Sequence, residues 1–521
     1  MKMKKNKRFE LALLILIFGI NAAWAQKTIS INNVSHSCTF EANPQLQNFS
    51  HNNVGDTLLL DFLGDKHYKA VVLQAGKSYD GITSITAQVA DTEFGYCYIS
   101  VAENNIALSV EIPQKNEFFS IKKIAGKNYL IEQPLSEVQH EHDDECIHIS
   151  EHDSLGIARS PQLRAVPSTL PENPAAVTVD LLVVYTPAAK AVAVQNGSDM
   201  DMMIAQGIQR SNLVLNNSLT NVTLNVVHKQ EVAYTETNDP NTDLIRLRNM
   251  KDGYADEVHA LRSRYKADMV VLLLGESSSN VAGAGYIMNS EYGNPNSGFS
   301  VMKAKHIAGS YTLIHEVGHN FGCGHHTDTD NIAIYSYAHG YRGFTTQGNK
   351  FSTIMTYENA NGINYPRIPY FSDPNLSFEG TATGSANDAN NAKTIRQTKG
   401  LIAAYSDEAP WTDSFLQDIK LSSGALSPAF NPGVYQYTVE VDNSVTSIDV
   451  QGIPNSTYSN VSGDVKAMPL TVGSNQEVKM TVEDGWGNYP RDYKITITRK
   501  QIQNNKKVII INKMISSTIK R

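Results

Sequence analysis

Three histidines and one glutamate, in the order His-Glu-x-x-His-x-x-Gly-x-x-His, have the types and spacing of a metal centre. His315 and His319 are four residues apart, so on a helix both imidazoles lie on one face and can bind the same ion. Glu316 lies beside that pair, where its carboxylate can take a proton from a water molecule instead of binding the ion. Gly322 can adopt the positive φ that ends a helix, which lets His325 return as the third ligand.

Three histidine ligands predict one zinc ion (Zn²⁺) with a position left for water, which is typical of a catalytic rather than a structural site. A bare His-Glu-x-x-His arises by chance on surface helices, but the glycine and the third histidine at fixed offsets make chance a poor explanation. His326 adjoins His325 and is an alternative ligand, although the spacing favours His325. His306 and His339 are interpreted as ordinary polar histidines.

A second motif, Ser352-Thr353-Ile354-Met355-Thr356-Tyr357, follows the third histidine. Together with the extended zinc motif it resembles the metzincin metalloproteases, in which a tight Met-turn lies beneath the three imidazoles. The resemblance implies that Met355 forms this turn. It also implies that Tyr357 is a zinc-proximal tyrosine that stabilises the tetrahedral oxyanion, as in the astacin-like and serralysin-like members.

Residues 177–407 resemble, more narrowly, the bacterial reprolysin-like group of metzincins. The resemblance extends over an opening strand at 180–186, the segment Tyr-Phe-Ser-Asp-Pro at 370–374 and a closing helix at 386–405. It implies an α/β metzincin catalytic domain. The disulfide pattern of the animal members cannot be carried over, because Cys323 is the only cysteine in this region.

The residue pattern of the same region independently predicts an α/β fold with a mixed, largely parallel sheet plus the zinc helix. Apolar runs rich in β-branched residues predict strands, and apolar residues at helical spacing predict helices between them. The predicted strands are 177–187, 221–228 and 268–274, and the predicted helices are 199–216, 256–265 and, for the zinc motif, 311–321. Glycine-containing runs at 282–287 and 298–303 are interpreted as an edge strand to which a peptide could pair, or as a bulged loop.

The N-terminus has the pattern of a secretory signal peptide. Basic residues precede an apolar stretch from Leu11 to Ile20 and a small-x-small pattern that ends at Ala25, so we assign residues 1–25 to the signal. A membrane anchor is the alternative, but the apolar stretch is short for a span. We therefore expect a secreted, extracellular protein with no stable membrane insertion after signal cleavage, or one associated with the cell surface. The net charge of −8 argues against nucleic acid as a partner.

Residues 26–165 alternate apolar and polar residues in short runs, which predicts a mostly β propeptide that acts as an intramolecular inhibitor. Residues 166–176 are the predicted linker and processing segment. Cys38 and Cys97 both lie in strand-like sequence, so a disulfide between them is one of the pairings open to the four cysteines.

Cys146 suggests a possible latency ligand, because a propeptide thiolate could occupy the water position of the zinc ion until cleavage. The alternative is that the acidic, histidine-rich residues around it form a solvated linker. The surrounding letters do not match the Pro-Arg-Cys-Gly type of cysteine switch. A second metal bound by the local histidines is a further, weaker interpretation.

Residues 413–499 contain short alternating strands between turns and resemble the cadherin-like β-sandwich of bacterial surface proteins. Such sandwiches bind glycans, bind proteins or space domains, so the resemblance indicates a fold rather than a function. The tail 500–521 is basic, and its role is unknown.

The expected function is that of a secreted zinc endopeptidase, made as a zymogen, that hydrolyses internal bonds of protein or peptide substrates. Glu316 would be the general base. One alternative is a surface adhesin whose protease module serves mainly self-processing, and another is a zinc hydrolase of non-peptide amides. Carboxylates are present without the spacing of a calcium loop, so structural Ca²⁺ has no support.

Overall fold

The structure is a computed structural model of the 521-residue chain. It describes residues 26–30, 38–39, 44–62, 66–92, 94–103, 105–124, 126–135, 145–149, 170–250, 252–276, 279–329, 332–408, 413–485, 487 and 490–501, with the backbone alone for 26–30, 38–39, 44, 62, 124, 145–149 and 408. The predicted signal peptide and nearly all of the predicted tail lie outside these residues. Residues 1–410 and 411–521 are two compact units, and each has its own arrangement.

The first unit begins with a sheet of nine strands among the described residues, in the order β1-β3-β4-β5-β6-β7-β8-β9-β2. The strands are β1 (Gln26–Ser30), β2 (Cys38–Thr39), β3 (Thr57–Phe62), β4 (Lys66–Lys77), β5 (Thr83–Val89), β6 (Tyr96–Ala102), β7 (Asn105–Ile112), β8 (Glu117–Ile124) and β9 (Lys127–Pro134). Apart from the parallel pair β1–β3, neighbouring strands are antiparallel.

The suggested disulfide between Cys38 and Cys97 is wrong, because Cys97 is a free and fully buried thiol. Cys38 lies on β2, which pairs with β9, whereas Cys97 lies on β6, with β7, β8 and β9 between them in the sheet. Neighbouring strands are about 4.8 Å apart. Two cysteines separated by three intervening strands of one sheet are therefore beyond the span of a disulfide unless the sheet closes on itself.

Strands β6 and β7 are buried on both faces, although their sequences alternate between apolar and polar residues. One face, which includes Cys97, Ile99 and Val110, packs in the core of the N-terminal sheet. The other face, which includes Tyr98 and Ser109, lies against the rest of the unit. The face of β6 and β7 that carries the polar residues is thus a buried interface rather than a solvated surface.

The second sheet of this unit has six strands among the described residues, in the order β10-β14-β15-β13-β11-β12. The strands are β10 (Glu145–Ile149), β11 (Val177–Tyr185), β12 (Val222–Glu231), β13 (Met269–Leu274), β14 (Val281–Tyr286) and β15 (Phe299–Lys303). All neighbouring pairs are parallel except β14–β15, which is antiparallel.

Helices and small hairpins surround this second sheet. The helices are α3 (Pro187–Gln195), α4 (Met200–Asn217), α5 (Pro240–Arg248), α6 (Glu257–Tyr265), α7 (Thr312–Asn320), α8 (Asn391–Ile402) and α9 (Tyr405–Glu408). The hairpins pair β16 (Arg342–Phe344) with β17 (Lys350–Ser352), β18 (Asn359–Ala360) with β19 (Ile363–Asn364), and β20 (Ser377–Phe378) with β21 (Thr381–Ala382). Helix α7 packs on β14 and β15.

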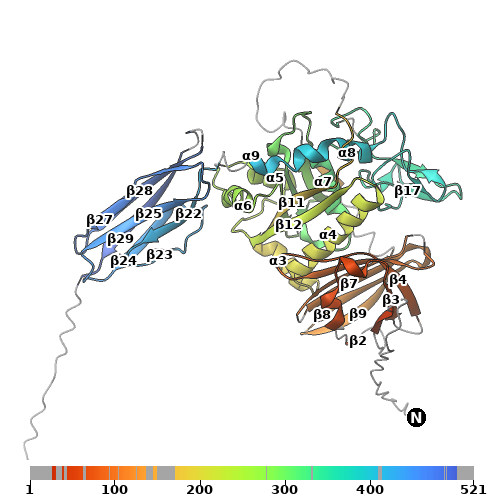
Figure 1. The fold of residues 1–521 in the computed structure, drawn as a ribbon, viewed down its shortest axis with the longest axis horizontal. Coiled ribbons are helices and arrows are strands. Elements are labelled where there is room, and N and C mark those ends of the chain that lie inside the picture. The colour runs from red at the N-terminus through yellow and green to blue at the C-terminus, as the bar shows by residue number, and fades with distance from the viewer. Residues whose placement is uncertain are drawn as a thin grey trace, which may run out of the picture. The chain divides into compact units, whose positions relative to one another are not determined.

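Helix α4 lies between the two sheets, as Figure 1 shows, and contacts β5, β6 and β7 on one side and β12 and α7 on the other. It begins at an N-cap, Asp199, whose side chain accepts a hydrogen bond from the Met202 amide. Gln209 donates to the Ile99 carbonyl and to the Ser100 hydroxyl. The helix is buried on almost every side because it serves both cores.

A buried ion pair joins α4 to the N-terminal sheet. The Arg210 guanidinium binds the Glu111 carboxylate at 2.5 Å and the Ser109 hydroxyl at 3.0 Å, and it lies over the Tyr98 ring at 4.1 Å. Its Nε donates to the Ala308 carbonyl, in the segment that leads into α7. Arg210 therefore links the N-terminal sheet to the start of the helix that carries the metal motif.

The second unit is a sandwich of two sheets, of three strands (β22-β25-β27) and five strands (β23-β24-β29-β28-β26) among its described residues. The strands are β22 (Leu416–Leu421), β23 (Leu426–Ser427), β24 (Gln436–Val441), β25 (Ser447–Pro454), β26 (Asn460–Ser462), β27 (Val465–Pro469), β28 (Asn475–Glu483) and β29 (Arg491–Arg499). Alternate residues of β24 and β29 are buried, so each strand contributes one face to a single core.

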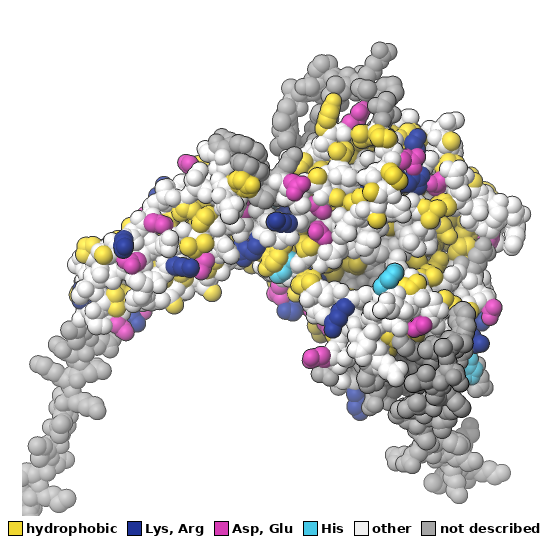
Figure 2. Space-filling model, in the orientation of Figure 1, with side chains coloured by type: hydrophobic (Ala, Val, Ile, Leu, Met, Phe, Trp, Pro, Cys, Tyr) yellow, Lys and Arg dark blue, Asp and Glu magenta, His cyan; other side chains and the backbone are white. Residues whose placement is uncertain are grey.

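Acidic and basic side chains are interspersed on the face drawn in Figure 2, without a broad patch of one sign. Within the part of the chain that the structure describes, none of the helices has the length and apolar character needed to cross a membrane.

Replacing Glu111 with Ala should destabilise the chain by about 3–5 kcal/mol, because it leaves the Arg210 guanidinium buried without its counter-ion. The midpoint of urea unfolding of the intact chain measures this. Glu231→Ala is the matched control, since Glu231 forms an ion pair with Lys190 in which both side chains are exposed. The control should leave the midpoint nearly unchanged. Equal effects of the two substitutions would contradict a structural role of the buried pair.

Candidate active site

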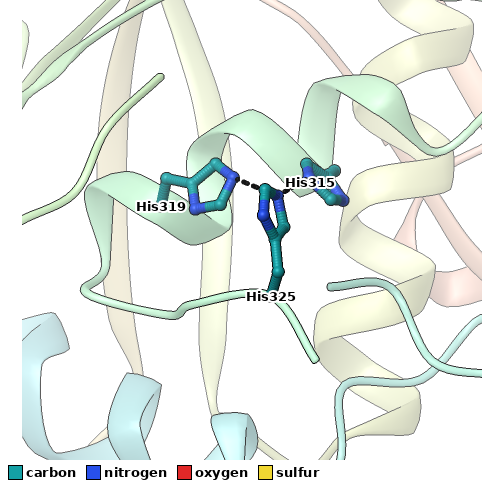
Figure 3. A group of neighbouring side chains, drawn as sticks. All are labelled: His315, His319 and His325. Atoms are coloured by element: carbon teal, nitrogen blue, oxygen red, sulfur yellow. Dashed lines mark hydrogen bonds between the residues drawn. The ribbon is translucent and has the colours of Figure 1, made fainter. Parts of the chain in front are cut away.

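Helix α7 and the loop after it bring His315, His319 and His325 together, as Figure 3 shows. The first two imidazoles project from one face of the helix, and the third rises toward them from the loop. The Nε2 atom of His325 lies 3.1 Å from the Nε2 atoms of both His315 and His319. All three side chains are fully buried, so their relative positions are fixed by packing.

Backbone carbonyls fix the tautomers of the two helical histidines. The Nδ1 atom of His315 is 2.8 Å from the Ile354 carbonyl, and the Nδ1 atom of His319 is 2.9 Å from the Cys323 carbonyl. A carbonyl can only accept, so Nδ1 carries the proton in each ring and Nε2 carries a lone pair. These second partners orient the rings in the way that protein ligands of zinc are oriented.

The three residues fit a zinc ion. Lone pairs on neighbouring Nε2 atoms repel one another unless a cation or a proton lies between them, so a buried cluster of this kind is suited to a cation. Tetrahedral zinc with Zn–N bonds near 2.05 Å places its nitrogen ligands about 3.3 Å apart. The observed separations of 3.1 Å are close to that value. Neutral imidazole nitrogens are also among the ligands that zinc prefers.

The turn after α7 returns the chain to the site. Gly322 has a φ of +93°, in the left-handed region that favours glycine. The Cys323 amide donates to the Gly318 carbonyl, which ties the turn to α7. The Gly324 amide donates to the Ala338 carbonyl, which ties the turn to the later part of the loop. This turn places His325 opposite the helical face that carries the other two histidines.

Glu316 lies between α7 and strand β14, and its side chain is buried. A Cβ atom at Gly283 would lie 2.6 Å from its Oε1, and a Cβ atom at Gly285 would lie 2.9 Å from its carbonyl oxygen. Real side chains do not approach so closely, so both glycines are required for the helix to pack on this strand. The glycine-rich strand thus forms the wall behind the carboxylate.

Met355 packs against α7 at Gly318. A Cβ atom at Gly318 would lie 2.6 Å from the Met355 sulfur, so the missing side chain of Gly318 is what admits the turn. The turn is closed by the Thr356 hydroxyl, which donates to the Thr353 carbonyl at 2.7 Å. The carbonyl of Ile354 in the same turn binds His315, so the turn both supports the ligands and orients one of them.

Tyr357 is adjacent to the metal-binding group. Its ring centroid is 4.7 Å from that of His325, with an angle of 46° between the rings. The side chain is half-buried, so its phenol lies at the boundary between the protein and the solvent. This position is compatible with a donor that reaches a group bound at the centre.

The other candidate residues lie outside the histidine group. His326 pairs through Nδ1 with the Asp328 carboxylate at 2.7 Å, which excludes it from the cluster in this conformation. His339 is buried and contacts the His325 carbonyl. Cys146 lies on β10, where its backbone pairs with Gly283, and its side chain lies outside the described part of the chain. The latency hypothesis for Cys146 therefore stays a prediction.

Asn320 is a positioning residue that the sequence did not indicate. Its amide nitrogen donates to the carbonyls of Tyr286, Ser297 and Phe299, at 2.8–3.1 Å. These bonds hold the end of α7 to the strands β14 and β15. The only signal in the sequence is the asparagine directly after the second histidine; the burial that makes its amide need partners is seen in the structure.

Comparison with known proteins agrees with this geometry. Residues 175–372 match the model of metallo-peptidase family M12, and residues 416–500 match the model of the cadherin-like beta sandwich domain. The chain carries a family M12 metallopeptidase domain. By similarity this domain is that of a metalloendopeptidase, and residues 416–500 add a cadherin-like β-sandwich.

Relatives that match part of the chain carry the name peptidyl-Asp metalloendopeptidase and come from several bacteria. The protein of that name from Stenotrophomonas maltophilia (strain R551-3) is 29% identical over 332 residues, which cover 63% of this chain and 74% of the relative. The Xanthomonas campestris protein is 30% identical over 54% of this chain and 66% of its own length. The Pseudomonas aeruginosa protein is 34% identical over 45% of this chain and 40% of its own.

Replacing His319 with Ala should abolish stoichiometric zinc binding by the metallopeptidase domain, because two imidazoles and a water molecule bind the ion much more weakly than three. Zinc content after dialysis, measured by mass spectrometry, gives the result. His326→Ala is the matched control, since it removes an adjacent histidine that lies outside the cluster. Loss of zinc in the control and retention in His319→Ala would assign the ligands differently.

Proposed function

We propose that the chain is a secreted zinc endopeptidase, made as a zymogen, in which Glu316 is the general base for hydrolysis of internal peptide bonds. The observation that carries the proposal is a buried carboxylate, packed against strand β14, on the helix that contributes two residues of the three-histidine group. A carboxylate beside a cation site can accept a proton from water at that site. The apolar stretch at 11–20 and the small-x-small pattern support secretion.

Each residue of the proposed site has a separate role. A bound zinc ion supplies a Lewis acid that acidifies water and polarises the carbonyl of the scissile bond. Glu316 accepts the proton of the attacking water and passes it to the leaving amine. Tyr357, next to His325, donates a hydrogen bond to the oxyanion that develops on the former carbonyl oxygen. Asn320 and the carbonyl of Ile354 keep the helix and its ligands in position.

Strand β14 is the proposed peptide-binding edge. It is the outermost strand of the sheet apart from β10, and its glycines lie directly against Glu316. An extended peptide that pairs with β14 by main-chain hydrogen bonds would run past the carboxylate and the histidines. Pairing through main-chain groups does not depend on the substrate's side chains, so an endopeptidase can bind many different peptides in this way.

Strand β10 supports the proposed latency, because it already occupies that edge. Its residues 145–149 pair in parallel with β14, with Cys146 opposite Gly283 and Ile149 opposite Tyr286. A substrate and β10 cannot use the same main-chain groups at the same time. The N-terminal region would thus inhibit by competition for the edge, whether or not the Cys146 thiolate also binds the ion.

Helix α8 indicates where processing should occur. Gln397 donates to the Leu170 carbonyl, the Asn173 amide donates to the Arg396 carbonyl, and Lys399 donates to the Ala175 carbonyl. Residues from Leu170 onward are therefore held to the metallopeptidase region. We place the processing site before Leu170. The part of the predicted linker 166–176 that is open to cleavage is therefore shorter than the sequence suggested.

We further propose that substrates carry aspartate next to the scissile bond. The support is the name that the relatives share, peptidyl-Asp metalloendopeptidase. Mapping of cleavage sites in a peptide library by mass spectrometry, with and without a chelator, tests activity and preference together. Processing confined to the chain itself would instead favour an adhesin whose protease module matures it.

Glu316→Gln should retain zinc and lower kcat by about 10²–10⁴-fold, because the amide cannot accept the proton. Zinc content and turnover of a fluorogenic peptide are measured on the same preparation. The control is Glu276→Gln, at an exposed carboxylate that pairs with Lys305. Turnover of Glu316→Gln within tenfold of the unmodified enzyme would reject the general-base role (about 1.4 kcal/mol in the barrier).

Two variants separate strand competition from thiolate ligation in the zymogen. Ile147→Pro/His148→Pro removes two consecutive amide donors of β10, one of which must face β14, so it should raise the activity of the unprocessed chain. Cys146→Ala leaves the backbone pairing intact and should raise activity only if the thiolate binds zinc. Activity is followed with the fluorogenic peptide, in chains whose integrity is checked by mass spectrometry. Unchanged latency in both variants would exclude β10 as the inhibitor.

A further inference from the structure

Selectivity for aspartate requires a cation beside the reacting groups, so this inference rests on the proposed substrate preference. A carboxylate is bound best by an arginine, whose planar guanidinium offers parallel donors to both oxygens. Two arginines are linked by contacts to residues next to the metal-binding group, one through Asp328 and His326 and the other through the Thr356 carbonyl. They are Arg342, on β16, and Arg367, which follows β19.

Arg342 already has a carboxylate partner. Its two terminal nitrogens donate to the two oxygens of Asp328 at 3.1 and 2.8 Å, and the same carboxylate binds His326. Both terminal nitrogens of the Arg342 guanidinium are therefore already bound to a carboxylate of the protein itself. A substrate carboxylate would have to displace Asp328 to bind there.

Arg367 contacts the peptide unit that precedes the proposed oxyanion donor, Tyr357. Its Nη2 donates at 2.7 Å to the carbonyl of Thr356, which directly precedes Tyr357, and the Tyr357 ring contacts the His325 ring at 4.7 Å. One peptide unit therefore separates the guanidinium from the tyrosine. We infer that a substrate side chain next to the scissile bond would come within reach of both groups.

The Arg367 guanidinium has no forked partner. Its side chain is 10% exposed, and its Nε atom is buried without a hydrogen bond. The nearest carboxylate with which it is paired, that of Glu358, is 3.8 Å from Nε, which is beyond hydrogen-bonding distance. A buried guanidinium in this state gains more from a carboxylate ligand than an exposed one does, because less solvation is lost on binding.

The backbone holds Arg367 in a fixed position relative to the Met-turn. The Ser352 amide donates to the Pro366 carbonyl and the Ile368 amide to the Ser352 carbonyl, so residues 366–368 pair with the strand that leads into Met355. The backbone carbonyl of Glu358 accepts a hydrogen bond from the Tyr365 amide, across the hairpin formed by β18 and β19. Preorganisation of this kind favours discrimination between similar side chains.

We propose that Arg367 binds the carboxylate of the substrate aspartate and is the residue that sets aspartate selectivity. The mechanism is differential binding of the transition state. An aspartate gains charge-assisted hydrogen bonds from the guanidinium, and the isosteric asparagine gains weaker ones. Glu358 is the internal competitor for the same guanidinium and lowers its net attraction for anions.

The test compares two peptides that differ only in aspartate or asparagine next to the cleaved bond, with the processed, zinc-loaded enzyme. The measured quantity is the ratio of kcat/KM for the two peptides. Arg367→Gln should lower this ratio by about 10- to 100-fold, through loss of hydrogen bonds between charged groups. Turnover of the asparagine peptide should fall by a smaller factor than that of the aspartate peptide, because asparagine makes only the weaker hydrogen bonds to the guanidinium.

Matched variants keep the result interpretable. Arg342→Gln should leave the ratio nearly unchanged, since that guanidinium is already bound to Asp328. Arg367→Lys keeps the charge without the fork and should give an intermediate ratio, and Glu358→Gln should raise the ratio. Zinc content shows whether each variant retains the site.

The outcomes separate the two proposals. An aspartate preference in the unmodified enzyme that persists in Arg367→Gln and Arg367→Lys overturns the assignment of Arg367 and leaves the substrate class intact. A fall of the ratio in Arg342→Gln alone transfers the role to that residue and also overturns the assignment. Equal cleavage of both peptides by the unmodified enzyme overturns the substrate class and this inference together.

Discussion

The site depends on the close approach of helix α7 to strand β14. Gly283 and Gly285 leave no side chain between the two elements, and the space that their Cβ atoms would need is taken by the Glu316 carboxylate and by the Glu316 carbonyl oxygen, respectively. The same contact sets the distance from the metal-binding histidines to the sheet edge. A methyl group at Gly283 would displace either the carboxylate or the strand, so catalytic geometry and the proposed peptide-binding edge are fixed by one packing constraint.

The local geometry of the centre was predictable because it is encoded in short spacings. Two histidines four residues apart share a helical face, and a glycine at positive φ returns the third. The supporting contacts were not predictable in this way. The carbonyls of Ile354 and Cys323 and the carbonyl targets of Asn320 become neighbours only when distant segments pack, and no spacing in the sequence specifies such pairs.

Much of the second sheet could also be predicted, since its strands are continuous apolar runs between helices. Helices α3 and α5 were missed although both carry a start signal. Thr186 and Asp239 are N-caps followed by Pro187 and Pro240 at the first helical position. In β7 the alternation was interpreted correctly as a strand but not as an interface, because Ser109 and Glu111 look like solvent-facing residues until Arg210 is placed opposite them.

The buried ion pair between Arg210 and Glu111 would be broken if the N-terminal sheet separated from the rest of the unit. Arg210 is fully buried, and desolvation opposes its charge while Glu111 and the neighbouring tyrosines raise the pKa of the guanidinium. Removal of the sheet would expose this cation, together with Gln209, to water, so hydration would replace the lost partner. The bond from Arg210 to the Ala308 carbonyl belongs wholly to the metallopeptidase region and would persist. The start of α7 would therefore keep its anchor, and release of the N-terminal region need not disturb the zinc ligands that follow.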